Sequence, residues 1–355
     1  MDIVERMHEP RSVMRQEIDD QPAALARTLD ALADSLPAMR ELRDRRFTSV
    51  LLIARGTSDH VADYAQYLFP CSAGLIATSA SPSVAVAFRA RVPLHGAIAI
   101  AISQSGATVE IVETAIWAKS MGAFTVGISN VAGSPLAGVV DLPLITQAGP
   151  EVAVPATKTY TSALATIAYL AAVLGDQSGL MTELFRMPEI MQMTLDLPWD
   201  LERAAAIFSG SNTAVLTGRG FTAGVARESA LKLKETSGIN AVGASVADLV
   251  HGPIAALVSG LPVACFSPGV ASPIAAGLED LVQRAAARHC RILTIGPHEA
   301  LQQSSEVHVN TPAVSEELAP FPLIVPGQLL AERVARLCGM NPDEPTGLHK
   351  ITQTT

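Results

Sequence analysis

The sequence predicts an α/β fold made of two similar domains, each a parallel sheet covered by helices. The chain has 355 residues, which suits two domains of roughly 150 residues each. Apolar residues make up 49% of the chain and aromatic residues only 4%, a balance typical of buried parallel strands under Ala-rich helices. In addition, the second half repeats the order of strand and helix patterns seen in the first.

Short apolar runs alternate with helical patterns in both halves. Strands are expected at 49–54, 96–102, 123–128 and 142–145, and again at 213–217, 262–266, 291–295 and 307–309. Helices are expected after each glycine turn, over 155–174, over 273–289 and over 327–338. This alternation indicates βαβ units with right-handed crossovers, and hence parallel sheets.

The same patterns predict the domain boundaries. We expect an N-terminal helical segment at 1–46, a first domain at 47–180, a helical linker at 181–203 and a second domain at 204–340. Residues 341–355 form a C-terminal tail.

Charge and composition exclude several classes of function. A net charge of -9 argues against nucleic acid as a partner, since phosphate neutralisation needs clustered Lys and Arg. The N-terminus has no apolar signal core, and no apolar run approaches the ~18 residues of a membrane helix. We therefore expect a cytoplasmic protein without membrane contact.

The four cysteines are scattered and are expected to be buried free thiols, namely Cys71, Cys265, Cys290 and Cys338. Neither a metal cluster nor a dinucleotide fingerprint occurs, so no metal or cofactor is expected.

Residues 103–108, Ser-Gln-Ser-Gly-Ala-Thr, follow a predicted strand and open a predicted helix. Gly106 allows a tight turn, while Ser103, Ser105 and Thr108 supply hydroxyls beside the free N–H groups of a helix start. Thr57 and Ser58, after the neighbouring strand, complete a ring of donors. Helix capping would explain one hydroxyl well but five converging hydroxyls poorly. The loop is therefore predicted to bind phosphate.

The second half provides an internal comparison for this loop. Its equivalent, residues 267–271, reads Ser-Pro-Gly-Val-Ala. Most hydroxyls are missing, and Pro268 lacks an N–H donor. Phosphate binding is therefore expected in the first half alone.

A wider set of motifs resembles the SIS (sugar isomerase) domain family, and specifically the isomerase half of glucosamine-6-phosphate synthase and the stand-alone SIS-type glucosamine-6-phosphate deaminases. The matching stretches lie at 16–22, 56–58, 103–108, 156–158, 230–235, 251–253 and 341–350. The resemblance covers nearly the whole chain. It implies two tandem αβα sandwiches of flavodoxin-like type, N-terminal helices and a C-terminal tail at the active site.

The resemblance also implies roles for individual residues. Phosphate ligands would be Ser58, Ser103, Gln104, Ser105 and Thr108, with Thr57 nearby. Val154 matches a sugar-contacting position. The catalytic glutamate maps onto Glu235, a further active-site lysine onto Lys232, the ring-opening histidine onto His251 and the C-terminal lysine onto Lys350. In related isomerases the histidine comes from the neighbouring subunit, which implies a homodimer with a shared active site.

These residue types suit aldose–ketose chemistry on a phosphorylated sugar. One carboxylate, Glu235, can move a proton between C1 and C2. His251 can exchange a proton near neutral pH while the ring opens, and Lys350 can stabilise an enolate or form an imine.

Each of these residues also has a simpler interpretation. Lys232 and Glu235 could be a solvated ion pair worth ~0.2–0.5 kcal/mol. His251 could belong to an ordinary turn, and Lys350 could be a tail charge. Lys158 is expected to face a helix end or a neighbour.

The stretch at 240–248, Asn-Ala-Val-Gly-Ala-Ser-Val-Ala-Asp, departs from the family pattern. Val242 lacks the usual carboxylate, which bears on substrate preference. No N-terminal cysteine nucleophile follows Met1, so a glutaminase domain is not expected.

The function predicted first is an amino sugar phosphate deaminase, converting glucosamine 6-phosphate to fructose 6-phosphate and ammonia. The alternative is a synthase-like isomerase or aminotransferase without a glutaminase domain, or an isomerase of another phosphosugar. A non-catalytic phosphosugar sensor is the third interpretation.

Overall fold

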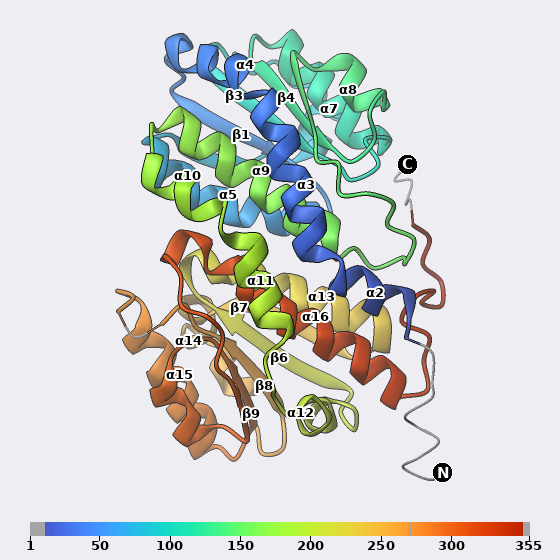
Figure 1. Ribbon diagram of the computed structural model, residues 1–355, viewed down its shortest axis with the longest axis vertical. Helices are drawn as coiled ribbons and strands as arrows, with labels where there is room; N and C mark the ends of the chain where they lie inside the picture. The colour runs from blue at the N-terminus through green and yellow to red at the C-terminus, as the bar shows by residue number, and fades with distance from the viewer. Residues whose placement is uncertain (1–10, 270, 351–355) are drawn as a thin grey trace.

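Two parallel five-stranded sheets form the framework of the protein in a computed structural model that describes residues 11–269 and 271–350 (Figure 1). The first sheet has the order β2-β1-β3-β4-β5 and the second the order β10-β9-β8-β6-β7. Read from its other edge, the second sheet has the same connectivity as the first. This confirms the predicted duplication and the α/β fold class. The strands are β1 (Ser49–Ile53), β2 (Ile76–Ser79), β3 (Ala97–Ile102), β4 (Phe124–Ser129), β5 (Leu142–Ile145), β6 (Thr213–Gly218), β7 (Asn240–Ser245), β8 (Pro262–Phe266), β9 (Arg291–Ile295) and β10 (Val307–Val309).

The two edge strands β2 and β7 were missing from the predicted set. Both are rich in small and polar residues and lie partly in solvent, so they lack the apolar run that marks the central strands. Each occupies the same place in its sheet, beside the strand that opens the domain. The stretch that departs from the family pattern is therefore β7 and the short helix that follows it.

Helices cover both faces of each sheet. The α-helices are α2 (Val13–Asp19), α3 (Gln21–Asp34), α4 (Leu36–Glu41), α5 (Thr57–Ala73), α6 (Pro82–Val86), α7 (Val109–Ser120), α8 (Pro135–Val139), α9 (Lys158–Leu174), α10 (Ser178–Leu184), α11 (Met187–Leu195), α12 (Leu201–Phe208), α13 (Ala223–Ser237), α14 (Val246–Val250), α15 (Ala275–Ala287) and α16 (Pro320–Leu337). Short 3-10 helices are η1 (Leu42–Arg45), η2 (Gly220–Thr222), η3 (Pro253–Ala256), η4 (Glu299–Ser304) and η5 (Glu316–Leu318).

Two helix starts differ from the predicted ones. The helix α9 begins at Lys158, where the Glu151 carboxylate accepts hydrogen bonds from the backbone N–H groups of Thr157, just before the helix, and Thr159, in its first turn. The helix α16 begins at Pro320, seven residues before the expected start at 327. Proline fits the first turn of a helix, where its missing N–H would have had no partner.

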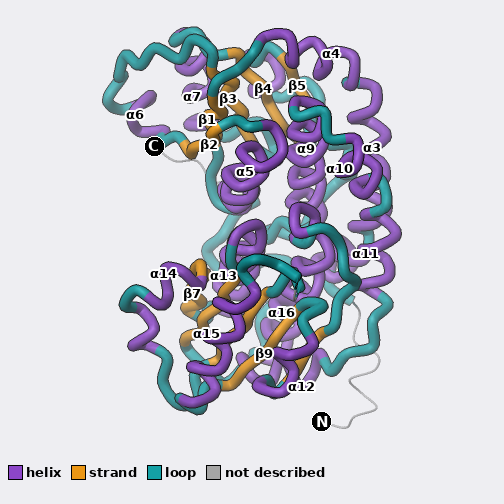
Figure 2. Tube along the Cα trace, turned by 90° about the vertical axis from the view of Figure 1, so that its left-hand side faces the viewer, coloured by secondary structure: helices purple, strands orange, loops and turns teal. Residues whose placement is uncertain are grey.

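The inner helices of the two domains pack against one another (Figure 2). Helices α5 and α9 lie on the inner face of the first sheet, and α13 and α16 lie on the inner face of the second. A single continuous core runs between them, from Leu68 and Leu164 to Leu233 and Leu330. The outer faces carry separate apolar clusters under α7 and α15. The two domains therefore share one core, and their facing loops are held in fixed positions.

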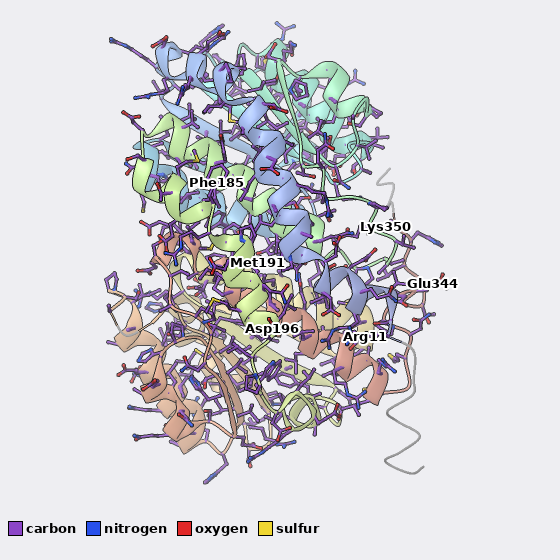
Figure 3. All side chains as sticks on the ribbon, in the orientation of Figure 1. Arg11, Phe185, Met191, Asp196, Glu344 and Lys350 are labelled. Carbon is purple, nitrogen blue, oxygen red and sulfur yellow. The ribbon has the colours of Figure 1, made fainter. Side chains whose placement is uncertain are left out.

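The C-terminal tail returns from the second domain toward the first along the edge of the molecule (Figures 1 and 3). Asp343 accepts hydrogen bonds from the backbone N–H groups of Val13 and Met14, at 2.9 and 2.7 Å. Its own carbonyl accepts from Val154 N at 2.9 Å. Negative charge at the start of α2 is favourable because the first N–H groups of a helix are unpaired. These contacts attach the tail to the N-terminal helices and to the loop before α9.

Two of the four cysteines differ from expectation. Cys265 and Cys290 are buried free thiols, as predicted, whereas Cys71 and Cys338 are exposed. Burial raises the pKa of the Cys265 thiol to about 12. Within the described ranges, no helix is both long and apolar enough to cross a bilayer.

Candidate active site

A pocket of about 370 Å³ lies where the first sheet, helix α13 and the C-terminal tail meet. Its volume falls within the range of small-molecule sites, roughly 300–1,000 Å³. It brings together all the predicted site residues except His251. The lining residues are Arg55, Gly56, Thr57, Ser58, Ile102, Ser103, Gln104, Ser105, Thr108, Ile111, Val154, Ala156, Lys232, Glu235, Leu348, His349 and Lys350.

The loop at 103–108 follows β3 and precedes α7 as predicted. Gly106 has φ +61°, and an added Cβ would lie 2.2 Å from Ser134 Oγ, so both conformation and space require glycine there. The Ser103 and Thr108 hydroxyls are 3.3 Å apart. Thr108 is the N-cap of α7, yet its side chain makes no capping hydrogen bond. The Thr108 hydroxyl therefore leaves the first N–H groups of α7 uncapped, which is the arrangement expected of an anion site rather than of simple capping.

In the second domain, the serine that follows β8 contacts a histidine of the same domain. Ser267 is fully buried and lies 3.0 Å from His298 Nδ1. On its other side, the His298 ring lies 2.8 Å from Glu279 Oε1. The Ser267 hydroxyl is therefore already engaged with a side chain of its own domain. The asymmetry of phosphate binding predicted from Pro268 stays a prediction.

Helix α13 carries the charged side of the pocket. Lys232 is 1% exposed and lies 2.6 Å from Glu235 Oε2 and 3.3 Å from Glu228 Oε1. Its ammonium also donates to Thr57 Oγ1 at 3.2 Å, and Thr57 donates to Glu228 at 3.0 Å. Lys232 is therefore buried and Glu235 only partly exposed, so the interpretation of an ordinary solvated pair is wrong. Thr57, which belongs to the first domain, thus hydrogen-bonds to this cluster on the second.

Electrostatics keeps the cluster ionised despite its burial. Burial alone would raise the pKa of Glu228, but the Lys232 charge and the hydrogen bond with His60 outweigh it and hold that pKa below its ordinary value. Burial would likewise lower the pKa of Lys232, but Glu228 and Glu235 raise it. A charge without partners at such a site would be very costly. Among the described residues, Glu235 Oε1 has no hydrogen-bond partner, so this oxygen is free to face a ligand.

The tail places Lys350 at the pocket rim, beside the loop that precedes α9. Its ammonium lies 2.9 Å from Glu151 Oε2 and 2.6 Å from the Ala153 carbonyl. Val154, on the same loop, also lines the pocket. Lys158 instead forms an ion pair with Asp20 at 2.8 Å, which confirms that it faces a neighbour.

His251 lies on the surface of the second domain, outside the lining of this pocket. The resemblance placed this histidine in the site of a neighbouring subunit, and that role stays a prediction. His349, next to Lys350, is the histidine that lines the pocket from the same chain.

Sequence reasoning also missed Glu228 and His60. A signal for Glu228 was available, because it lies four residues before Lys232 and therefore on the same helix face. Similarly, His60 lies one turn after Thr57 on α5. Within the described ranges, His, Cys, Asp and Glu side chains nowhere gather in a group of three that could hold a metal ion.

Known proteins are similar to this chain in sequence and fold. The SIS domain family matches residues 41–173 and 207–335. A glutamine–fructose-6-phosphate aminotransferase (isomerizing) of Pyrococcus horikoshii is 34% identical over 343 residues, which are 95% of this chain and 57% of the relative. The chain thus spans a little over half the length of this relative.

Solved structures agree with this match. A protein of Silicibacter pomeroyi proposed to be a phosphosugar isomerase aligns with a TM-score of 0.85 and 31% identity, over 94% of this chain and 100% of that chain. The C-terminal domain of glucosamine-fructose-6-phosphate aminotransferase from Francisella tularensis aligns with a TM-score of 0.86 and 26% identity, over 95% and 99%.

Proposed function

This chain belongs to the SIS domain family, and we propose that it is a phosphosugar isomerase whose substrate is an amino sugar phosphate. The observation that carries the proposal is the shared pocket, where a hydroxyl-lined loop of one domain faces Glu235 of the other. A phosphate on the loop would anchor one end of an open-chain sugar. The reacting carbons at the other end would then face the carboxylate.

The chemistry follows from the groups around the pocket. Glu235 takes a proton from C2 or C1 of the open-chain sugar and returns it to the neighbouring carbon, which interconverts aldose and ketose. Lys232 binds Glu235 through Oε2 and leaves Oε1 for this transfer. Lys350 lies at the rim, where its amine can react with a sugar carbonyl.

Relatives named as aminotransferases favour an isomerase of the synthase type over the deaminase predicted first. Both activities use one equilibrium, between glucosamine 6-phosphate plus water and fructose 6-phosphate plus ammonia. The preferred direction is therefore a matter for measurement. The cytoplasmic location and the homodimer with a shared site stay predictions.

Assays in both directions test the proposal. Purified protein is incubated with glucosamine 6-phosphate, and separately with fructose 6-phosphate and an ammonium salt, while ammonia and both sugars are followed. We expect turnover that falls about 10²- to 10⁴-fold in Glu235→Gln, the range for loss of a general base. Glu189→Gln, an exposed substitution on α11, is the matched control and should retain activity.

Other outcomes would contradict the proposal in different ways. A ketose formed from a non-amino sugar phosphate, with no reaction of the amino sugar, would show that the substrate is another phosphosugar. Saturable binding of sugar phosphates without any turnover would instead support the sensor.

A further inference from the structure

His60 lies at the joint between the two domains, one turn into α5. Its Nδ1 is 2.7 Å from Glu228 Oε2, and Glu228 is fully buried on α13. Because an ionised carboxylate only accepts hydrogen bonds, Nδ1 must carry the proton and donate it. The contact is therefore a charge-assisted hydrogen bond that crosses the domain interface.

Glu228 in turn competes with Glu235 for the Lys232 ammonium. Its Oε1 accepts from Thr57 at 3.0 Å and faces the Lys232 ammonium at 3.3 Å, while His60 occupies Oε2. Lys232 is thus shared between Glu228 and the pocket carboxylate Glu235. The chain of contacts runs from His60 to Glu235 through two fully or almost fully buried groups.

We propose that His60 is a positioning residue for Glu235: by donating to Glu228 it keeps that carboxylate ionised, so that Lys232 does not bind Glu235 alone. The inference rests on the proposed role of Glu235 in proton transfer. A glutamate that holds a whole lysine charge is a weaker base than one that shares it. Without the His60 donor, buried Glu228 would take up a proton, and the Lys232 ammonium would then form an ion pair with Glu235 alone.

The other ionisable groups near His60 and Glu228 do not take part in their contact. Asp63, on the same helix as His60, is paired with Arg227 of α13 at 2.7 Å. Burial and the nearby Asp63 raise the pKa of Asp59. Tyr160 of α9 stays neutral, because burial and then the Glu228 charge raise its pKa well above its ordinary value. From α5, Glu228 is therefore bonded by Thr57 and His60.

The test compares His60→Leu with His60→Asn, whose amide N–H can replace the Nδ1 donor. In His60→Leu we expect kcat to fall roughly 10- to 100-fold, the factor for one hydrogen bond to a charged group. KM should change little, and the acid limb of the pH–rate profile should move to lower pH, since Glu235 becomes a weaker base. His60→Asn should restore most of kcat and return the limb to its original position.

A matched control is available in the second domain. His308 is also partly buried, and its Nδ1 lies 2.8 Å from Thr294 Oγ1, far along the chain from the pocket residues. His308→Leu should lower stability without moving the pH limb. If His60→Leu behaves like this control, or if His60→Asn does not restore kcat, the inference is wrong.

A second readout does not depend on turnover. In spectra of protein carrying ¹⁵N-labelled histidine, the His60 signal, identified by its loss in His60→Asn, should show a proton on Nδ1 from about pH 6 to 8. Glu228→Gln should shift that signal. A neutral ring that carries its proton on Nε2 and none on Nδ1 would overturn the inference even if the substrate were wrongly proposed. Absence of turnover in the unsubstituted protein would instead refute the proposed function alone.

Discussion

The ammonium of Lys350 lies 2.9 Å from Oε2 of Glu151, a carboxylate that is completely buried behind the pocket rim. The other oxygen of Glu151 accepts from the backbone N–H groups of Thr157 and Thr159, at 2.9 and 3.1 Å. One glutamate therefore orders the start of α9 and also holds the end of the C-terminal tail.

Glu151→Gln should separate these two tasks. The amide oxygen can keep both backbone hydrogen bonds, whereas the charge that holds Lys350 is lost. We expect kcat with the amino sugar phosphate to fall roughly 10- to 100-fold through loss of a charge-assisted contact, with little change in melting temperature. Borohydride trapping of a lysine imine should fall in parallel. Thr159→Val is the control, because it removes only the 2.7 Å hydroxyl contact to Glu151. Full activity in Glu151→Gln would show that Lys350 needs no such partner.

Ser105→Ala should weaken phosphate binding. Loss of one hydroxyl donor to a dianion is expected to raise the Kd for a sugar phosphate about tenfold or more, while the Kd for the corresponding unphosphorylated sugar is unchanged. Ser267→Ala, at the buried serine that follows β8 in the second domain, should leave both constants unaltered. Titration calorimetry measures the Kd of each variant for the sugar phosphate and for the unphosphorylated sugar. Equal affinity in Ser105→Ala and in the unsubstituted protein would place the phosphate elsewhere.

Gly106→Ala and Gly133→Ala together separate backbone strain from steric conflict. Both glycines have positive φ, at +61° and +75°. A methyl at Gly133 meets nothing within 4 Å, whereas one at Gly106 meets Ser134. Gly133→Ala should cost about 1 kcal/mol of unfolding free energy. Gly106→Ala should cost about 1–3 kcal/mol more, as expected for overpacking, and should also weaken sugar phosphate binding. Denaturant unfolding distinguishes them, and equal losses would contradict the clash.

Stability at acid pH should depend on Glu228. The pKa of this carboxyl is lowered in the folded protein, so its stabilising contribution is present above the ordinary value of 4.5 and is lost as pH falls through the folded value. Glu228→Gln should therefore have a lower melting temperature than the unsubstituted protein at pH 7. The difference should shrink as the solution is acidified below about pH 4. Glu189→Gln should show no such convergence, and a difference independent of pH would mean that Glu228 acts through packing alone.

The sequence by itself determined the duplicated α/β scaffold and the position of the loop at 103–108 between a strand and a helix. Central strands such as β3 are continuous apolar runs. A glycine among hydroxyl residues at the end of a parallel strand, as at Gly106, indicates a ligand-binding turn. Both signals are local, so they can be recognised from neighbouring residues. The edge strands β2 and β7 were missed because half-exposed strands do not need the apolar pattern that burial imposes.

Only the tertiary structure decided how charges from distant segments combine. His60 and Glu228 are 168 residues apart, and Glu151 and Lys350 are 199 apart. Their pairing depends on the packing of α5 against α13 and on the path of the tail, which no local pattern encodes. The same is true of Lys232, whose sequence spacing to Glu235 fits a solvated pair equally well. Burial between two domains makes that pair part of the pocket, because charges removed from water must be matched by partners that the whole fold supplies.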